Sequence, residues 1–153
     1  LYPKTILHMI GPLQSNKVKG AIKIFDVIET LDREKIAIEL KKNTNKLKKF
    51  PKIYVQVNIG EEKQKHGCLP SEAKNFIRNC NDYGLDIKGV MAIPPLGEDP
   101  APYFALLSNI ANECNIKNIS MGMSKDFEMA IYLGATSVRI GTKIFGQRNY
   151  GKI

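Results

Sequence analysis

The chain has 153 residues, of which 43% are hydrophobic and 25% are charged, and its formal net charge at pH 7 is +8. This length and balance are typical of one globular domain, which we expect to span residues 1–153. No apolar run is long enough for a membrane span, and no signal peptide is readable. We therefore expect a cytoplasmic protein without a membrane partner.

The three cysteines, Cys68, Cys80 and Cys114, are widely spaced and odd in number. This pattern argues against a disulfide framework and favours reduced thiols in the cytoplasm. The two histidines, His8 and His66, form no ligand spacing with the cysteines. We therefore expect no metal site.

The positive charge is densest in residues 41–49, which contain five lysines. A basic surface of this kind can bind nucleic acid. However, no aromatic residue is interleaved with these lysines, and the stretch matches no recognisable binding module. We favour a solvated helix end followed by a loop, and we expect no nucleic-acid partner.

Apolar, β-branched runs alternate with helical patterns along the chain. The predicted strands are, in chain order, residues 5–10, 24–28, 52–59, 86–93, 118–121 and 137–140. The predicted helices are residues 31–43, 71–83, 102–114 and 124–133. This alternation predicts an α/β fold with parallel strands and helices outside, of the TIM-type (β/α) barrel kind. Such a barrel has eight strands, so about six units imply an open sheet or two missing N-terminal units.

Two turns near the end of the chain are candidates for a phosphate site. Ser124 follows Gly122 at a predicted helix start, where N–H groups attract anions and a glycine lets the backbone approach a ligand. Gly141 and Thr142 follow the strand predicted at 137–140, and sites gather at the carboxyl ends of parallel strands. Alternatively, Ser124 only caps its helix and Gly141 only turns the chain.

Two further polar residues interrupt apolar strands. Arg139 requires a partner or a ligand, because a charge is costly in a buried strand. The partner could be a carboxylate such as Glu29. His8 lies in the run 5–10, where a satisfied core histidine is more common than a catalyst. The sequence contains no nucleophile–base constellation, phosphate-binding Walker loop or dinucleotide fingerprint, so we assign no catalytic residue.

Five stretches in the same order resemble the pyridoxal 5'-phosphate (PLP) homeostasis protein family, the YggS/PROSC group. They read His-Met-Ile-Gly-Pro-Leu-Gln-Ser-Asn-Lys, Val-Gln-Val-Asn-Ile-Gly-Glu-Glu, Gly-Val-Met-Ala-Ile-Pro, Ser-Met-Gly-Met-Ser-Lys-Asp-Phe-Glu and Val-Arg-Ile-Gly-Thr. They occupy residues 8–17, 55–62, 89–94, 120–128 and 138–142. The resemblance extends over essentially the whole chain.

The resemblance implies a fold like the barrel domain of bacterial alanine racemase, without that enzyme's second domain. It also implies a PLP-binding protein of vitamin B6 homeostasis that carries the cofactor without robust catalytic turnover. The implied partners are PLP itself and PLP-dependent apoenzymes, and we expect a monomer. The alternatives are a racemase-like PLP enzyme, which would need a catalytic base from another domain, and a degenerate fragment without function.

The resemblance also implies eight cofactor-contacting residues. The phosphate is held by Ser124, Gly141 and Thr142, and its loop is shaped by Gly122 and Met123. The pyridine nitrogen faces Arg139, and the pocket mouth is lined by His8 and Asn16. An arginine that stays protonated disfavours a proton on the ring nitrogen, and the resulting weaker electron sink suits storage of the cofactor.

The chain departs from the family pattern in one respect. The family's Schiff-base lysine belongs to a motif like Val-Ser-Lys after the first barrel strand, and a motif like Gly-Glu-Asn follows the second. Neither motif occurs in this sequence. We therefore expect that two N-terminal units, with the lysine, are missing from this chain. Lys17 also follows a strand, but nothing indicates that it replaces the missing lysine.

Overall fold

The computed structural model describes residues 5–147. The strands β1 to β6 form one parallel sheet in chain order. They are β1 (His8–Met9), β2 (Val27–Leu31), β3 (Lys52–Val57), β4 (Ile87–Ala92), β5 (Asn118–Met123) and β6 (Ser137–Arg139). The helices are η1 (Ser15–Lys17), α1 (Val18–Ile24), α2 (Glu34–Leu47), α3 (Pro70–Asp82), α4 (Ala101–Glu113), α5 (Phe127–Tyr132) and α6 (Thr142–Phe145).

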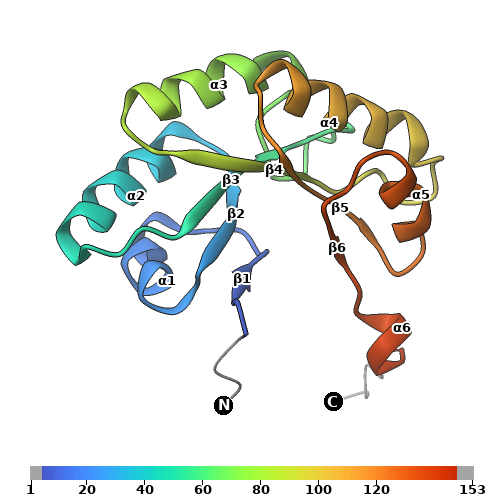
Figure 1. Ribbon diagram of the computed structural model, residues 1–153, viewed down its shortest axis with the longest axis horizontal. Coiled ribbons are helices and arrows are strands. Elements are labelled where there is room, and N and C mark those ends of the chain that lie inside the picture. The colour runs from blue at the N-terminus through green and yellow to red at the C-terminus, as the bar shows by residue number, and fades with distance from the viewer. Residues whose placement is uncertain (1–4, 148–153) are drawn as a thin grey trace.

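The sheet is an open arc with the helices on its outer side. Figure 1 shows α1 to α5 around the convex face, while β1 and β6 form the two ends of the arc. Within residues 5–147, each of these end strands pairs with a neighbour on one side only. The predicted α/β class and the predicted six of eight barrel units are therefore confirmed.

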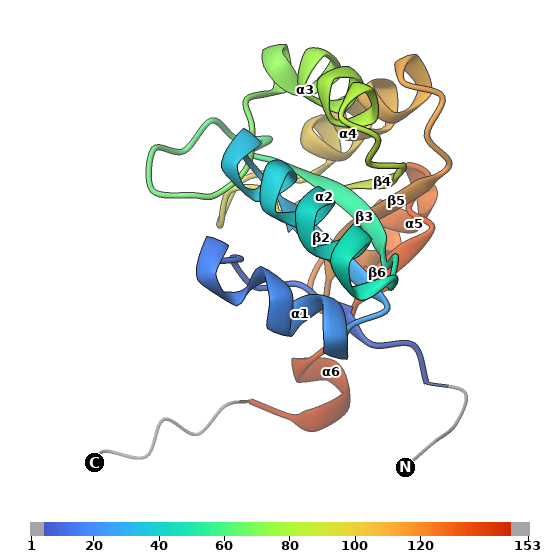
Figure 2. The ribbon, with the colours of Figure 1, turned by 90° about the vertical axis from the view of Figure 1, so that its left-hand side faces the viewer.

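The convex face of the sheet carries the apolar core. Helix side chains such as Ile36, Leu40, Phe104 and Leu107 are at most 1% exposed and pack in one cluster with the strands. α1 and α2 lie side by side (Figure 2). Burial of each such side chain contributes about 1.5–3 kcal/mol, so this layer supplies most of the stabilisation of the fold.

The concave face is different, because it carries buried polar groups. Glu29 on β2 and Ser120 on β5 are 1% and 0% exposed and hydrogen-bond to each other. β2 and β5 are separated in the sheet by β3 and β4, so only the inside of a curved sheet can bring these side chains together. The curvature therefore creates a polar layer that no pair of adjacent strands could form.

Two of the predicted elements have the wrong boundaries near the start of the chain. Residues 24–28 were predicted as a strand, but α1 runs to Ile24 and β2 extends from Val27 to Leu31. The prediction missed α1, in which Val18, Ala21 and Ile22 form a buried face at helical spacing. The helix predicted at 31–43 begins later, at Glu34, because Leu31 belongs to β2.

Two further predicted elements are shorter than expected. β1 comprises only His8–Met9 of the predicted 5–10, since it has a single neighbouring strand. The helix predicted from 124 begins at Phe127, because the side chain of Asp126 accepts a hydrogen bond from Met123 N at 2.6 Å and closes a turn first. The strands predicted at 52–59, 86–93, 118–121 and 137–140 and the other two helices lie within two residues of the structure.

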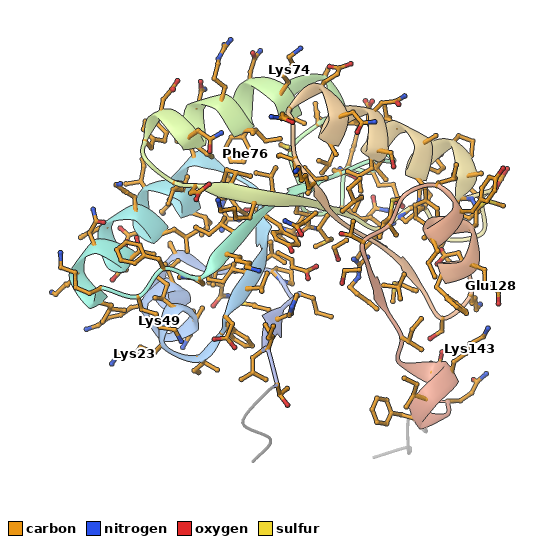
Figure 3. The ribbon with its side chains drawn as sticks, in the orientation of Figure 1. Lys23, Lys49, Lys74, Phe76, Glu128 and Lys143 are labelled. Carbon is orange, nitrogen blue, oxygen red and sulfur yellow. The ribbon has the colours of Figure 1, made fainter. Side chains whose placement is uncertain are left out.

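The lysine-rich stretch belongs mainly to the end of α2, which closes at Lys48 with φ of 52°. Figure 3 shows Lys23, Lys49 and Lys74 on the outer side of the molecule. In the part of the chain that the structure describes, no helix is long and apolar enough to span a membrane. The same residues contain no group of three or more His, Cys, Asp or Glu side chains that could hold a metal ion.

We predict that Gly122→Ala destabilises the fold strongly. Gly122 has φ of +88°, and an added Cβ would lie 2.5 Å from Ala130 Cβ, where α5 packs on β5. Gly97→Ala is the matched control, because Gly97 has φ of +87° with no atom within 4 Å of an added Cβ. In urea unfolding, we expect a loss of about 1 kcal/mol at Gly97 and about 2–4 kcal/mol at Gly122. Equal losses would show that the contact with α5 is unimportant.

We also predict that two of the three cysteines resist alkylation in the native chain. Burial raises the pKa of the Cys68 and Cys80 thiols to about 12, so at pH 8 both are protonated and unreactive. Cys114 is half-buried. With iodoacetamide and mass spectrometry, Cys114 should label first, and Cys68 and Cys80 only when urea unfolds the chain. Rapid native labelling of Cys68 or Cys80 would contradict the burial.

Candidate functional site

The turn after β5 contains Gly122, Met123 and Ser124. We expected that Gly122 lets the backbone approach a ligand, but the structure gives it another role. The space in front of Gly122 is filled by α5, since an added Cβ would meet Ala130 Cβ at 2.5 Å and Phe127 Cα at 3.1 Å. Gly122 therefore lets α5 pack against the strand. The Met123 side chain is 45% exposed at the end of the strand.

Ser124 does not lie at the start of α5, as the sequence had suggested. Its hydroxyl oxygen instead accepts hydrogen bonds from the backbone N–H groups of Gly141 at 3.2 Å and Lys143 at 3.4 Å. These two donors belong to the residues around the start of α6. The turns after β5 and β6, separated by 17 residues in the sequence, are thus joined by one side chain.

Gly141 and Thr142 leave open space in front of this turn. Gly141 has φ of −114°, and an added Cβ would have no atom within 4 Å. Thr142 is exposed as the first residue of α6. Here the missing side chain of a glycine opens access to backbone N–H groups, because no neighbouring element fills the space. The Ser124 hydroxyl and the N–H groups of Gly141 and Lys143 meet here, and hydroxyls and N–H groups are the donors that an anion binds.

Lys143 adds positive charge on the outer side of the turn. Its ammonium group lies 3.9 Å from Glu128 Oε1 and 4.4 Å from the centre of the Phe127 ring. Figure 3 shows Lys143 and Glu128 at the surface of the molecule. The Lys143 side chain is therefore directed to α5, and its backbone N–H is the group that faces Ser124.

Arg139 ends β6 with a side chain that is 9% exposed. Its Nη1 donates to Ser120 Oγ at 2.6 Å and lies 4.0 Å from Glu29 Oε2, and its Nη2 donates to the Ala92 carbonyl at 2.9 Å. The partner considered from the sequence, Glu29, is thus present. Burial lowers the pKa of the Arg139 guanidinium, while the charges of Glu29 and Asp126 oppose this effect.

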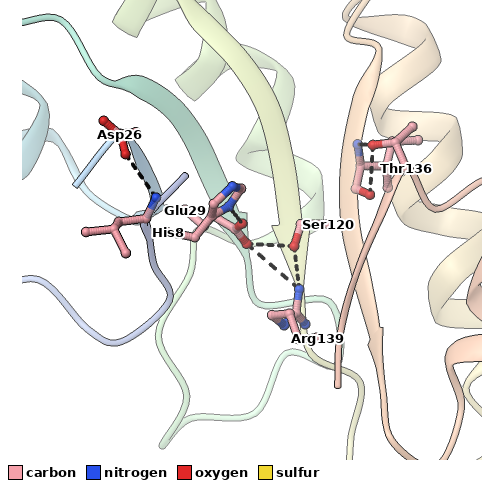
Figure 4. Close-up of polar contacts among 8 residues, drawn as sticks. His8, Asp26, Glu29, Ser120, Thr136 and Arg139 are labelled. Atoms are coloured by element: carbon pink, nitrogen blue, oxygen red, sulfur yellow. Dashed lines mark hydrogen bonds and ion pairs between the residues drawn. The ribbon is translucent and has the colours of Figure 1, made fainter. Parts of the chain in front are cut away.

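His8 also joins Glu29, from the opposite end of the sheet. His8 Nδ1 lies 2.6 Å from Glu29 Oε1, and the His8 side chain is 33% exposed. An ionised carboxylate only accepts hydrogen bonds, so His8 donates through Nδ1. Figure 4 shows the resulting row of His8, Glu29, Ser120 and Arg139, which connects β1, β2, β5 and β6. We call these four residues the polar row.

Two members of the concave face were not singled out from the sequence. Ser120 bridges Glu29 and Arg139, and Tyr54 on β3 is 5% exposed with its ring against Gly89 of β4. Burial raises the pKa of the Tyr54 hydroxyl, and the charge of Glu29 raises it further. In the sequence, each of these two residues is a polar residue within an apolar strand, which could have marked it as a candidate. That pattern does not reveal which other strand supplies its hydrogen-bond partner.

Asn16 stands apart from the other candidates. It lies in η1 with an exposed side chain, and no hydrogen bond or ion pair among residues 5–147 joins it to them. A hollow of about 220 Å³ lies at the carboxyl ends of β1, β3 and β4, with Ile10, Pro12 and Lys65 among its lining residues, but Asn16 does not line it. A larger hollow, of about 400 Å³, lies between α4 and α5 and touches none of the candidate residues.

Comparison with known proteins places this geometry in a family. Residues 1–149 match the model of the alanine racemase N-terminal domain. The chain is 39% identical to the pyridoxal phosphate homeostasis protein of Pasteurella multocida, with 95% of this chain and 67% of that protein covered. It is 37% identical to the human protein of the same name, with 99% and 62% covered. The chain thus spans about two thirds of the length of these relatives.

Solved structures agree with these sequence matches. PipY of Synechococcus elongatus without PLP superposes with a TM-score of 0.87 at 32% identity, over 94% of this chain and 72% of PipY. PipY with PLP bound gives a TM-score of 0.81 at 29% identity, over 95% and 72%. Alanine racemase of Clostridium difficile shares the fold, with a TM-score of 0.73 at 16% identity over 99% and 42%. The chain belongs to the pyridoxal phosphate homeostasis protein family and has the fold of the alanine racemase N-terminal domain.

Proposed function

We propose that this chain binds PLP at the joined turns after β5 and β6 and serves in PLP homeostasis without catalysing a reaction of its own. The observation that carries the proposal is the convergence of the Gly141 and Lys143 N–H groups on Ser124, because these N–H groups follow the buried Arg139 by two and four residues. A family relative, PipY, has been solved with PLP bound, which supports the choice of ligand.

The residues present suit the phosphate group of PLP. A phosphate ester carries close to two negative charges, and backbone N–H groups and hydroxyls bind such a group without bringing a negative charge of their own. Ser124 and Thr142 supply the hydroxyls, and the open side of Gly141 supplies access. Met123 and Gly122 shape the turn. The phosphate would take over the N–H groups that now face Ser124.

The position of Arg139 suits the pyridine ring. When bound, PLP supplies an aldehyde and an electron-withdrawing ring. Nη1 and Nη2 of Arg139 are held by Ser120 and Ala92, and Nε has no hydrogen-bond partner among the described residues. We assign Arg139 to the ring nitrogen and His8 and Asn16 to the mouth of the site. A guanidinium at the nitrogen keeps the ring unprotonated and therefore less able to stabilise a carbanion.

This weak activation of the ring is the physical basis for proposing storage and transfer of PLP in preference to turnover. The names of the curated relatives agree with this role. We further propose that PLP-dependent apoenzymes receive the cofactor, and that the chain works as a cytoplasmic monomer. No observation on the structure favours a racemase-like activity.

We predict that Ser124→Ala weakens binding of the phosphate group. The ligand is 4-deoxypyridoxine 5'-phosphate, which keeps the ring and phosphate but has no aldehyde to react with surface lysines. The loss of one hydrogen bond to a charged group should raise its Kd about tenfold in fluorescence titrations.

The control variant is Ser71→Ala, an exposed serine on α3. A second control is the ligand without its phosphate, 4-deoxypyridoxine, whose affinity should not change in Ser124→Ala. The site assignment is wrong if Ser124→Ala binds both ligands as the unaltered chain does, or if it loses affinity for both equally.

We predict that Arg139→Lys weakens binding of the same phosphate ester about tenfold, because an ammonium cannot contact Ser120, Ala92 and a ring nitrogen in fixed directions. The absorption spectrum of the bound ligand should also shift toward the form with a protonated ring. Arg78→Lys on α3 is the exposed control. An unchanged spectrum and affinity in Arg139→Lys would place the ring elsewhere.

A further inference from the structure

Glu29 is the one carboxylate of the polar row, and it lies at its centre. It is 1% exposed, and each of its oxygens accepts one short hydrogen bond, Oε1 from His8 and Oε2 from Ser120, both at 2.6 Å. Glu29 is not itself placed at the ligand. Its contacts nevertheless involve two elements that are distant in the sequence, since His8 is 21 residues and Ser120 is 91 residues away.

The direction of the hydrogen bonds in the row follows from Glu29. A serine hydroxyl has one proton, and that of Ser120 is used on the Glu29 carboxylate, which can only accept. A lone pair of Ser120 Oγ is therefore free to accept from Arg139 Nη1, as the 2.6 Å contact shows. Without the carboxylate, the Ser120 hydroxyl could rotate, and Arg139 would lose its fixed acceptor.

Glu29 also compensates the buried charge of Arg139. Burial lowers the pKa of the guanidinium, and the charge of Glu29 is the larger of the two that oppose this. A buried arginine without its carboxylate partner is strongly disfavoured and turns toward solvent where it can. The same side chain therefore supplies both the direction and the charge balance that keep Arg139 on the concave face (Figure 4).

We propose that Glu29 is a positioning residue for the cofactor ring: through Ser120 it holds the Arg139 guanidinium in the one orientation that faces the ring nitrogen. This inference rests on the proposed function, because it gives Arg139 the ring of PLP as its ligand. It adds a residue of β2 to a site whose phosphate and ring contacts come from β5, β6 and the turns that follow them, with His8 of β1 and Asn16 of η1 at its mouth.

The test compares Glu29→Gln and Ser120→Ala with the unaltered chain. Glu29→Gln keeps the shape of the side chain and removes its charge. Ser120→Ala removes only the hydroxyl that bridges Glu29 and Arg139, so the Ser120 variant provides the test if Glu29→Gln fails to fold. The matched control is Thr30→Val, the next residue of β2, because Thr30 is 1% exposed and its hydroxyl has no hydrogen-bond partner within residues 5–147.

The first readout needs no ligand. The sequence contains four arginines, so the side-chain ¹⁵N signal of Arg139 can be assigned by its loss in Arg139→Lys. We expect this signal to move and broaden in Glu29→Gln and Ser120→Ala, and to remain in place in Thr30→Val. An Arg139 signal that is the same in all four proteins overturns the inference.

The second readout is binding. We expect the Kd of 4-deoxypyridoxine 5'-phosphate to rise about tenfold in Glu29→Gln and Ser120→Ala, while the Kd of inorganic phosphate stays constant. A proportional loss for both ligands would mean that Glu29 only stabilises the fold, and it overturns the inference. If the unaltered chain binds neither ligand, the proposed function itself fails. If the unaltered chain binds both ligands and the variants bind them with the same Kd values, only the proposed role of Glu29 fails.

Discussion

The structure depends on one buried carboxylate. Glu29 lies on the concave face of a sheet whose convex face carries an ordinary apolar core, and it accepts hydrogen bonds from His8 on the end strand β1 and from Ser120 on β5. A buried charge of this kind is tolerated only when it is paired and fully hydrogen-bonded. The buried Glu29 carboxylate therefore needs three features together. These are the curvature of the sheet, the buried position of Arg139 and the orientation of the Ser120 hydroxyl, which pair its charge and satisfy its hydrogen bonds.

The second organising feature is the contact between the turns after β5 and β6. Ser124 accepts hydrogen bonds from the backbone at the start of α6, and so it sets the relative position of two strand ends that pair only loosely, with an irregular register between Ser120 and Met123. Together with Arg139, this contact places anion-binding donors and a guanidinium on the same two strands. That combination suits a ligand with a phosphate at one end and a basic ring nitrogen at the other.

Much of this arrangement could be predicted from the sequence, because its signals are local. Continuous apolar runs mark strands buried on both faces, proline marks the starts of α3 and α4, and glycine marks the end of α3. α1 was missed and the strand predicted at 24–28 began too early, because residues 21–28 contain no proline or glycine to mark the change from helix to strand, and that change at Phe25 depends on packing. Ser124 was misplaced for a similar reason, since Asp126 and not Ser124 precedes α5.

The sequence by itself determined the fold class, the family and the short list of polar residues at strand ends. It did so because hydrophobic periodicity and turn residues act over a few positions, and because the family motifs are contiguous. Only the tertiary structure decided which of these residues meet. The bonds from Glu29 to His8 and Ser120 and from Ser124 to Gly141 cross between strands or turns, and no local pattern encodes such a distance. The curvature of the sheet is what brings Glu29 within reach of Ser120 across the two intervening strands.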